Sequence, residues 1–181
     1  NIGKKIFLIG IFFLASAPFI SVIFFLFCLV ISFYIQFPKI YKDKWNYPLA
    51  LAALIMIIIT LIHNIYYIEI ETEIKEKLFS WSPTSSWIGL ANWLPLFFSY
   101  MGFQAFLSNK GDRKLCAQYL VAGSIPVLVT GFGQYFFDWH GPLEILNGLI
   151  VWYQYPIKHS AGLSGLFNNQ NYAGSWLNLV W

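Results

Sequence analysis

Charged residues are scarce in this sequence of 181 residues. Only 10% are Asp, Glu, Lys or Arg, whereas 58% are hydrophobic and 20% are aromatic. A soluble domain carries about 25% charged residues. Eleven basic and eight acidic side chains are too few to cover the surface of a soluble domain of this length. The composition therefore argues against a soluble protein and predicts that the apolar excess faces membrane lipid.

Cysteine and histidine are also rare. The two cysteines, Cys28 and Cys116, lie in or beside apolar segments, so no disulfide scaffold is expected. No CxxC or HExxH motif occurs, and the three histidines are too scattered to indicate a metal site. We expect no metal, no cofactor and no nucleic-acid partner.

The apolar residues form continuous runs, which favour helices over the alternating strands of a barrel. We predict an all-α, polytopic membrane protein with five to six membrane segments in one domain, 1–181. A start at Asn1 and an end inside an apolar run indicate the N-terminal part of a longer protein. The expected spans are about 6–37, 48–67, 87–107, 115–137 and a final one beginning at 171–181.

The first apolar block, Ile6 to Phe37, is too long for one upright span. Its 32 residues would form a helix of about 48 Å, against a hydrocarbon core of about 30 Å. Pro18 lies near its centre, and proline breaks or kinks a helix. Two structures fit this pattern: one long kinked helix, or a hairpin broken near Pro18 with arms of about 15 residues each.

The basic residues favour the hairpin. If the loops Lys39–Asn46 and Asn109–Lys114 are cytoplasmic, a hairpin gives eight Lys or Arg inside and three outside, whereas a single span gives six and five. The positive-inside rule prefers the first distribution. The connection Asp138–Gln170 would then face the periplasm of a bacterial inner membrane.

Pro142 and the glutamines of the spans give two further predictions. Pro142 can begin a helix that lies at the membrane surface or re-enters it, with an apolar face of Leu143, Leu146, Leu149 and Ile150. A connecting loop with anchoring aromatic residues is the alternative. The glutamines within or beside spans, such as Gln134, are expected to bond a neighbouring helix.

The segment Gly162–Gly174 is unusually rich in amides. Asn168, Asn169, Gln170 and Asn171 follow one another where the last span begins. One asparagine is explained as a helix N-cap, but four amides are not. Because amides both donate and accept hydrogen bonds, the cluster indicates a site for a hydroxyl-rich ligand such as a sugar.

The run Ser164-Gly165-Leu166-Phe167-Asn168-Asn169-Gln170-Asn171-Tyr172-Ala173 resembles a motif of the O-antigen ligase and polymerase superfamily. Gln170 stands where that family usually has proline. Gly162 stands where it often has a basic residue, so that the nearest basic groups are Lys158 and His159.

The resemblance implies a membrane glycosyltransferase. Such enzymes transfer a glycan from a polyprenyl diphosphate to a glycan, lipid or protein acceptor on the external face, without a metal or nucleotide. It implies substrate binding by Lys158, His159, Asn168, Asn169, Asn171 and Tyr172, with the catalytic groups beyond Trp181. The alternative is a multi-span transporter of a small solute or ion, which broken spans at Pro18 and Pro126 also suit.

The predicted topology can be tested by labelling single cysteines placed at positions 112 and 144. In intact cells, an impermeant maleimide should react at 144 and not at 112, because these positions lie in loops on opposite sides of the membrane. Labelling at 112 without labelling at 144 would contradict the topology.

Overall fold

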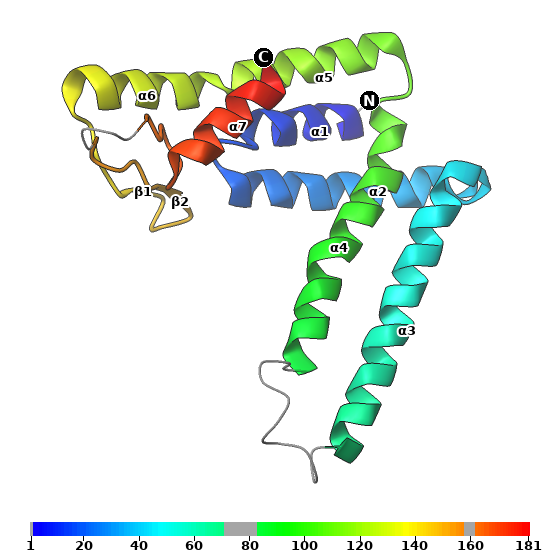
Figure 1. The fold of residues 1–181 in the computed structure, drawn as a ribbon. Helices are drawn as coiled ribbons and strands as arrows, with labels where there is room; N and C mark the ends of the chain where they lie inside the picture. The colour runs from blue at the N-terminus through cyan, green and yellow to red at the C-terminus, as the bar shows by residue number, and fades with distance from the viewer. Residues whose placement is uncertain (1, 71–82, 158–161) are drawn as a thin grey trace. The chain divides into compact units, whose positions relative to one another are not determined.

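The computed structural model describes residues 2–70, 83–157 and 162–181, the side chains of 64–70 and 83 excepted. The described part is mainly helical and divides into two compact units, 1–31 with 105–181 and 32–104. The elements are α1 Ile2–Phe13, α2 Pro18–Lys42, η1 Lys44–Asn46, α3 Tyr47–Ile70, α4 Pro83–Phe103, η2 Gln104–Phe106, α5 Lys110–Gly123, α6 Ile125–Phe137, β1 Leu143–Ile145, β2 Ile150–Trp152 and α7 Gln170–Val180 (Figure 1).

The first apolar block is a hairpin, not one kinked helix. Helix α1 ends at Phe13, and α2 begins at Pro18, where a missing backbone N–H is harmless. The two helices are antiparallel: Ser21 Oγ donates to the Gly10 carbonyl at 2.7 Å, and Cys28 Sγ donates to the Gly3 carbonyl at 3.4 Å. The arms are unequal, at 12 and 25 residues, because α2 continues through Pro38 to Lys42.

Three segments among the described helices are long and apolar enough to cross a membrane: Pro18–Lys42, Lys44–His63 and Lys110–Phe137. They correspond to the expected spans within 6–37, 48–67 and 115–137. The expected span 87–107 forms α4, which is not among them, since its sequence includes polar residues such as Asn92 and Ser99. Helix α7 has 11 residues.

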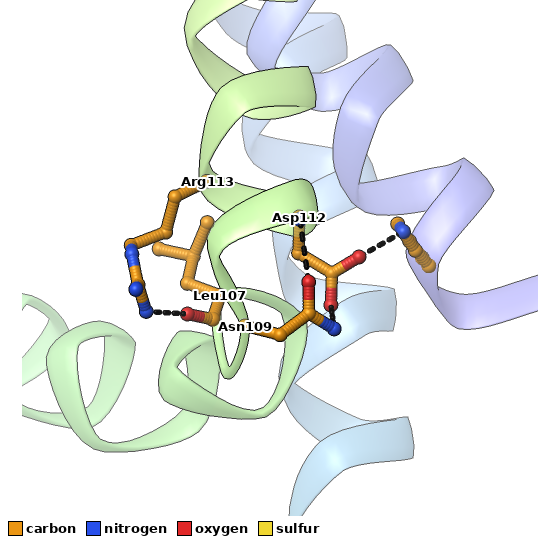
Figure 2. A network of polar contacts seen from close by, with 5 residues as sticks. Leu107, Asn109, Asp112 and Arg113 are labelled. Carbon is orange, nitrogen blue, oxygen red and sulfur yellow. Dashed lines mark hydrogen bonds and ion pairs between the residues drawn. The ribbon is translucent and has the colours of Figure 1, made fainter.

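An ion pair joins the start of α1 to the start of α5 in the first unit. Lys4 Nζ contacts Asp112 Oδ1, and Asn109 Nδ2 donates to the other carboxylate oxygen at 2.7 Å. Asn109 Oδ1 accepts from the Asp112 backbone N–H at 2.8 Å and so caps α5 (Figure 2). Lys4 and the Asn109–Lys114 segment therefore lie at the same end of this unit.

In the second unit, α3 and α4 pack side by side (Figure 1). Asn46, only 3% exposed, connects the start of α3 to the residue after α4 by accepting a 3.1 Å hydrogen bond from Gln104 Nε2. Ser32 Oγ of α2 donates to the Gly102 carbonyl at 2.7 Å. Buried amides and hydroxyls thus satisfy each other between largely apolar helices.

The helix expected from Pro142 is wrong, and a β-hairpin replaces it. Strands β1 and β2 pair antiparallel with Leu143 opposite Trp152 and Ile145 opposite Ile150. Leu146, Asn147 and Gly148 all have positive φ, which makes the turn between the strands. Asn-Gly is a strong hairpin signal, and Ile150 and Val151 favour strands, so local sequence outweighed the helical spacing of the leucines. The charged segment Glu69–Lys77, for which the sequence allows either a short helix in the membrane interface or a solvated loop, lies largely outside the described residues.

The close packing of α1 on α5 predicts the effect of adding one methyl group. A Cβ on Gly123 would lie 2.5 Å from the Phe12 carbonyl oxygen, whereas a Cβ on Gly131 of α6 would meet nothing within 4 Å. We expect Gly123→Ala to destabilise the protein by about 1–3 kcal/mol through overpacking. Thermal unfolding in detergent measures this, with Gly131→Ala as the matched control. Equal melting temperatures for both variants would contradict the packing.

Candidate functional site

The described residues between β2 and α7, 153–157 and 162–169, form a returning segment that packs on α6. Tyr153 donates its backbone N–H to the Leu166 carbonyl at 3.1 Å. Gly165 has φ +55°, and a Cβ there would lie 3.0 Å from the Val127 carbonyl of α6. Leu166 then joins Ala15 and Val127 in a buried apolar cluster. Glycine at 165 therefore allows both the left-handed backbone and the close approach to α6.

Gln134 of α6 holds this segment in place. Its side chain is 2% exposed, and its Oε1 accepts hydrogen bonds from the backbone N–H groups of Ser164 and Gly165, both at 3.0 Å. Its Nε2 donates to the Tyr155 carbonyl and, at 3.0 Å, to Ser164 Oγ. One buried amide thereby satisfies backbone groups that would otherwise lack partners beside an apolar helix.

Two further side chains support the returning segment. Gln154 is fully buried, and its Nε2 donates to the Thr130 carbonyl at 2.7 Å. Trp152 Nε1 donates to the Ser16 carbonyl at 2.7 Å, in the turn between α1 and α2. The segment is thus fixed to α6 on one side and to the N-terminal hairpin on the other.

A polar pocket of about 330 Å³ opens beside the Gln134 contacts. Five of the residues that line it carry amides, and none of its described lining residues is charged. The lining is formed by Gln134, Tyr155, Pro156, Gly162, Ser164, Asn168, Asn169, Gln170 and Asn171. Such a surface can offer both donors and acceptors to a neutral, hydroxyl-bearing ligand.

An apolar groove of about 90 Å³ lies on the other side of the same short segment. Gly162 and Ser164 line the polar pocket, whereas Leu163 and Gly165 line the groove. Leu128 and Phe132 of α6 and Leu177 of α7 complete its apolar surface. Residues 162–165 therefore form a wall with one polar and one apolar side.

The predicted site residues fall into three groups. Asn168, Asn169 and Asn171 line the pocket together, whereas Tyr172 does not, and is 60% exposed. Lys158 and His159 lie outside the described residues. Asn169 also caps α7, because its Oδ1 accepts from the Asn171 backbone N–H at 2.7 Å.

Gln134 and Ser164 belong to the site although their roles were not predicted. Gln134 was expected to bond a neighbouring helix, and it bonds a returning loop instead. The signal was present, since a glutamine in an apolar helix requires a buried polar partner. The position of Gln134 in its helix does not predict which distant segment supplies that partner.

No family model, characterised protein or solved structure matches the chain. The site therefore rests on its geometry and chemistry. Its distinguishing features are the Gln134 contacts and an amide-lined pocket that shares a wall with an apolar groove.

Gln134→Leu should loosen the segment that it holds. The change leaves the N–H groups of Ser164 and Gly165 and the Tyr155 carbonyl without their Gln134 partner, at a cost of about 1–3 kcal/mol for each group that stays buried. We expect faster hydrogen exchange in peptides covering 162–170. Gln118→Leu, at an exposed position on α5, is the control. Unchanged exchange in the Gln134 variant would show that the segment does not depend on this amide.

Proposed function

We propose that this chain is part of a membrane glycosyltransferase of the O-antigen ligase or polymerase type, which transfers a glycan from a polyprenyl diphosphate to a glycan, lipid or protein acceptor. The observation that carries the proposal is the amide-lined pocket that shares a wall with an apolar groove. A lipid-linked glycan has the same two parts, a hydroxyl-rich head and a hydrocarbon chain.

The pocket chemistry suits a sugar. Asn168 and Asn171 are exposed, and neither side chain has a hydrogen-bond partner among the described residues. Each amide can donate to and accept from hydroxyl groups. Because Asn169 caps α7, the cap holds the neighbouring amides at the start of that helix.

The combined length of α5 and α6 supports a position of the pocket near the external membrane surface. The segment Lys110–Phe137 has 28 residues, or about 42 Å of helix, against a core of about 30 Å. If the basic residues near Lys110 lie at the cytoplasmic surface, the helix enters the hydrocarbon core near Leu115. About 20 residues are needed to cross the core, so the helix leaves it near Gln134. Exposed Tyr135, Phe136 and Phe137 follow, as expected for side chains at an interface.

The diphosphate of the donor requires positive partners. None of the described residues that line the pocket is charged, and Lys158 and His159 follow its lining residue Pro156 in the sequence. We assign these two residues to the diphosphate. In transfer, the acceptor oxygen bonds the anomeric carbon while the bond from that carbon to the diphosphate breaks, and polyprenyl diphosphate leaves. We expect this step to take place on the periplasmic side of a bacterial inner membrane.

Substitutions in the full-length protein test the assignment. Lys158→Ala should remove a charge-assisted contact worth about 1.5–3 kcal/mol, which lowers donor affinity roughly ten- to hundredfold. Asn171→Ala should remove a neutral hydrogen bond worth about 0.5–1.5 kcal/mol. The measurement is glycan transfer to acceptor in membranes at matched expression, over a range of donor concentrations.

Two controls separate binding from folding. Asn178→Ala changes an exposed asparagine on α7 that does not line the pocket and should leave transfer unchanged. Asn169→Asp keeps a side-chain oxygen for the helix cap but removes an amide donor from the pocket, so a loss of transfer in this variant reports on the pocket and not on the cap. Wild-type transfer by stably inserted Lys158→Ala and Asn171→Ala proteins would refute the assignment. If these variants instead impair uptake of a small solute, the transporter alternative would be favoured.

A further inference from the structure

We propose that the β1–β2 hairpin inserts its tip into the acyl-chain region of the membrane that holds α6. The proposal rests on the membrane placement given under the proposed function but not on glycan transfer. It concerns residues 143–152, which lie outside both the pocket and the groove. The partner is the lipid of the surrounding bilayer.

The base of the hairpin is attached to the protein, whereas its tip is exposed in the part of the chain that the structure describes. At the base, Trp152 Nε1 donates to the Ser16 carbonyl at 2.7 Å, and the Gly141 N–H donates to the Gln154 carbonyl at 2.8 Å. At the tip, Leu146 and Leu149 are 60% and 52% exposed. The hairpin thus extends aliphatic side chains away from its anchored end.

The two faces of the hairpin differ in chemistry. Cross-strand partners lie on one face, so Leu143, Ile145, Ile150 and Trp152 share a face. Glu144 and Val151 share the other. Leu143 and Ile145 are 41% and 42% exposed, so the apolar face is only partly covered by the protein. Glu144 is the only charged residue within 143–152, which leaves the tip without a charge that would oppose entry into lipid.

The backbone of the turn favours the same conclusion. Leu146 has φ +56°, a conformation that is disfavoured for a bulky side chain. Its side chain is exposed and gains little from packing within the described protein. Burial in lipid would offset this disfavoured backbone, and strained residues of this kind occur at functional contacts.

The position of the hairpin relative to α6 identifies lipid as the partner. The hairpin follows α6, the last part of a segment long and apolar enough to span a membrane (Figure 1). Just after β2, Gln154 Nε2 donates to the Thr130 carbonyl of α6 at 2.7 Å. The end of α6 carries exposed Phe136 and Phe137, and Trp139 packs on Gly133 just before the hairpin begins. The end of α6 thus carries aromatic side chains typical of a membrane interface, and the apolar tip of the hairpin follows them in the chain after exposed Asp138 and His140.

Spin labels on single added cysteines test the insertion in the whole chain, reconstituted into phosphatidylcholine and phosphatidylglycerol vesicles. The label replaces Leu146, Glu144, Val129 or Lys110. Val129 is 50% exposed on α6 and serves as the lipid reference, and Lys110 serves as the water reference. The unsubstituted chain is the blank, because Cys28 and Cys116 are buried.

Collisions with oxygen, which concentrates in lipid, and with a water-soluble nickel complex report the surroundings of each label. The oxygen-to-nickel ratio at 146 is expected to approach that at 129 and to exceed those at 144 and 110. A ratio at 146 equal to that at 110 would overturn the proposal. Protection at 146 from both reagents would also overturn it, since a second copy would then cover the tip. If 129 itself is accessible to nickel, the membrane placement fails, whatever the result for glycan transfer.

Discussion

The structure around the pocket depends on satisfying backbone hydrogen bonds beside an apolar helix. A helix satisfies its own backbone hydrogen bonds, but the described residues of the returning segment, 153–157 and 162–169, do not, and they pack on the middle and end of α6. Gln134 supplies what is missing: its acceptor takes two N–H groups and its donor reaches one carbonyl. Without such a side chain, unpaired polar groups would oppose packing of the segment against α6.

The same arrangement explains why the pocket has a polar and an apolar neighbour. Residues 162–165 line the polar pocket and the apolar groove alternately, so the pocket and the groove lie on two sides of one wall. The wall is positioned by Gln134 from α6 and, through Leu166 and Ala15, by the turn of the N-terminal hairpin. Among the described residues, the side-chain amides of Asn168 and Asn171 take no part in this support. They are therefore available to bind a ligand.

The N-terminal hairpin also has a structural role within the first unit. Helix α1, with 12 residues, is only about 18 Å long. The connection between α1 and α2 contacts Trp152 and Leu166. The first helical turn of α1 is joined to α5 by the ion pair of Lys4 and Asp112. The short arm thus connects the charged start of α5 to the segment that carries the pocket.

The sequence alone determined features that depend on local chemistry. Continuous apolar runs predicted helices, Pro18 predicted a break or kink, and the asparagine run predicted a polar cluster and offered Asn168 or Asn169 as a helix cap, of which Asn169 is the one observed. Other features required contacts between distant residues. Gln134 lies 30 residues before Ser164 in the chain, and nothing in the spacing of either residue names the other. The apolar groove likewise forms only where α6 and α7 meet the loop. The β-hairpin is the intermediate case, because its sequence holds both an Asn-Gly turn signal and leucines at helical spacing, and only the structure decides between them. Local patterns fix which backbone conformations are favourable, whereas the partners of buried polar groups are decided by which segments pack together.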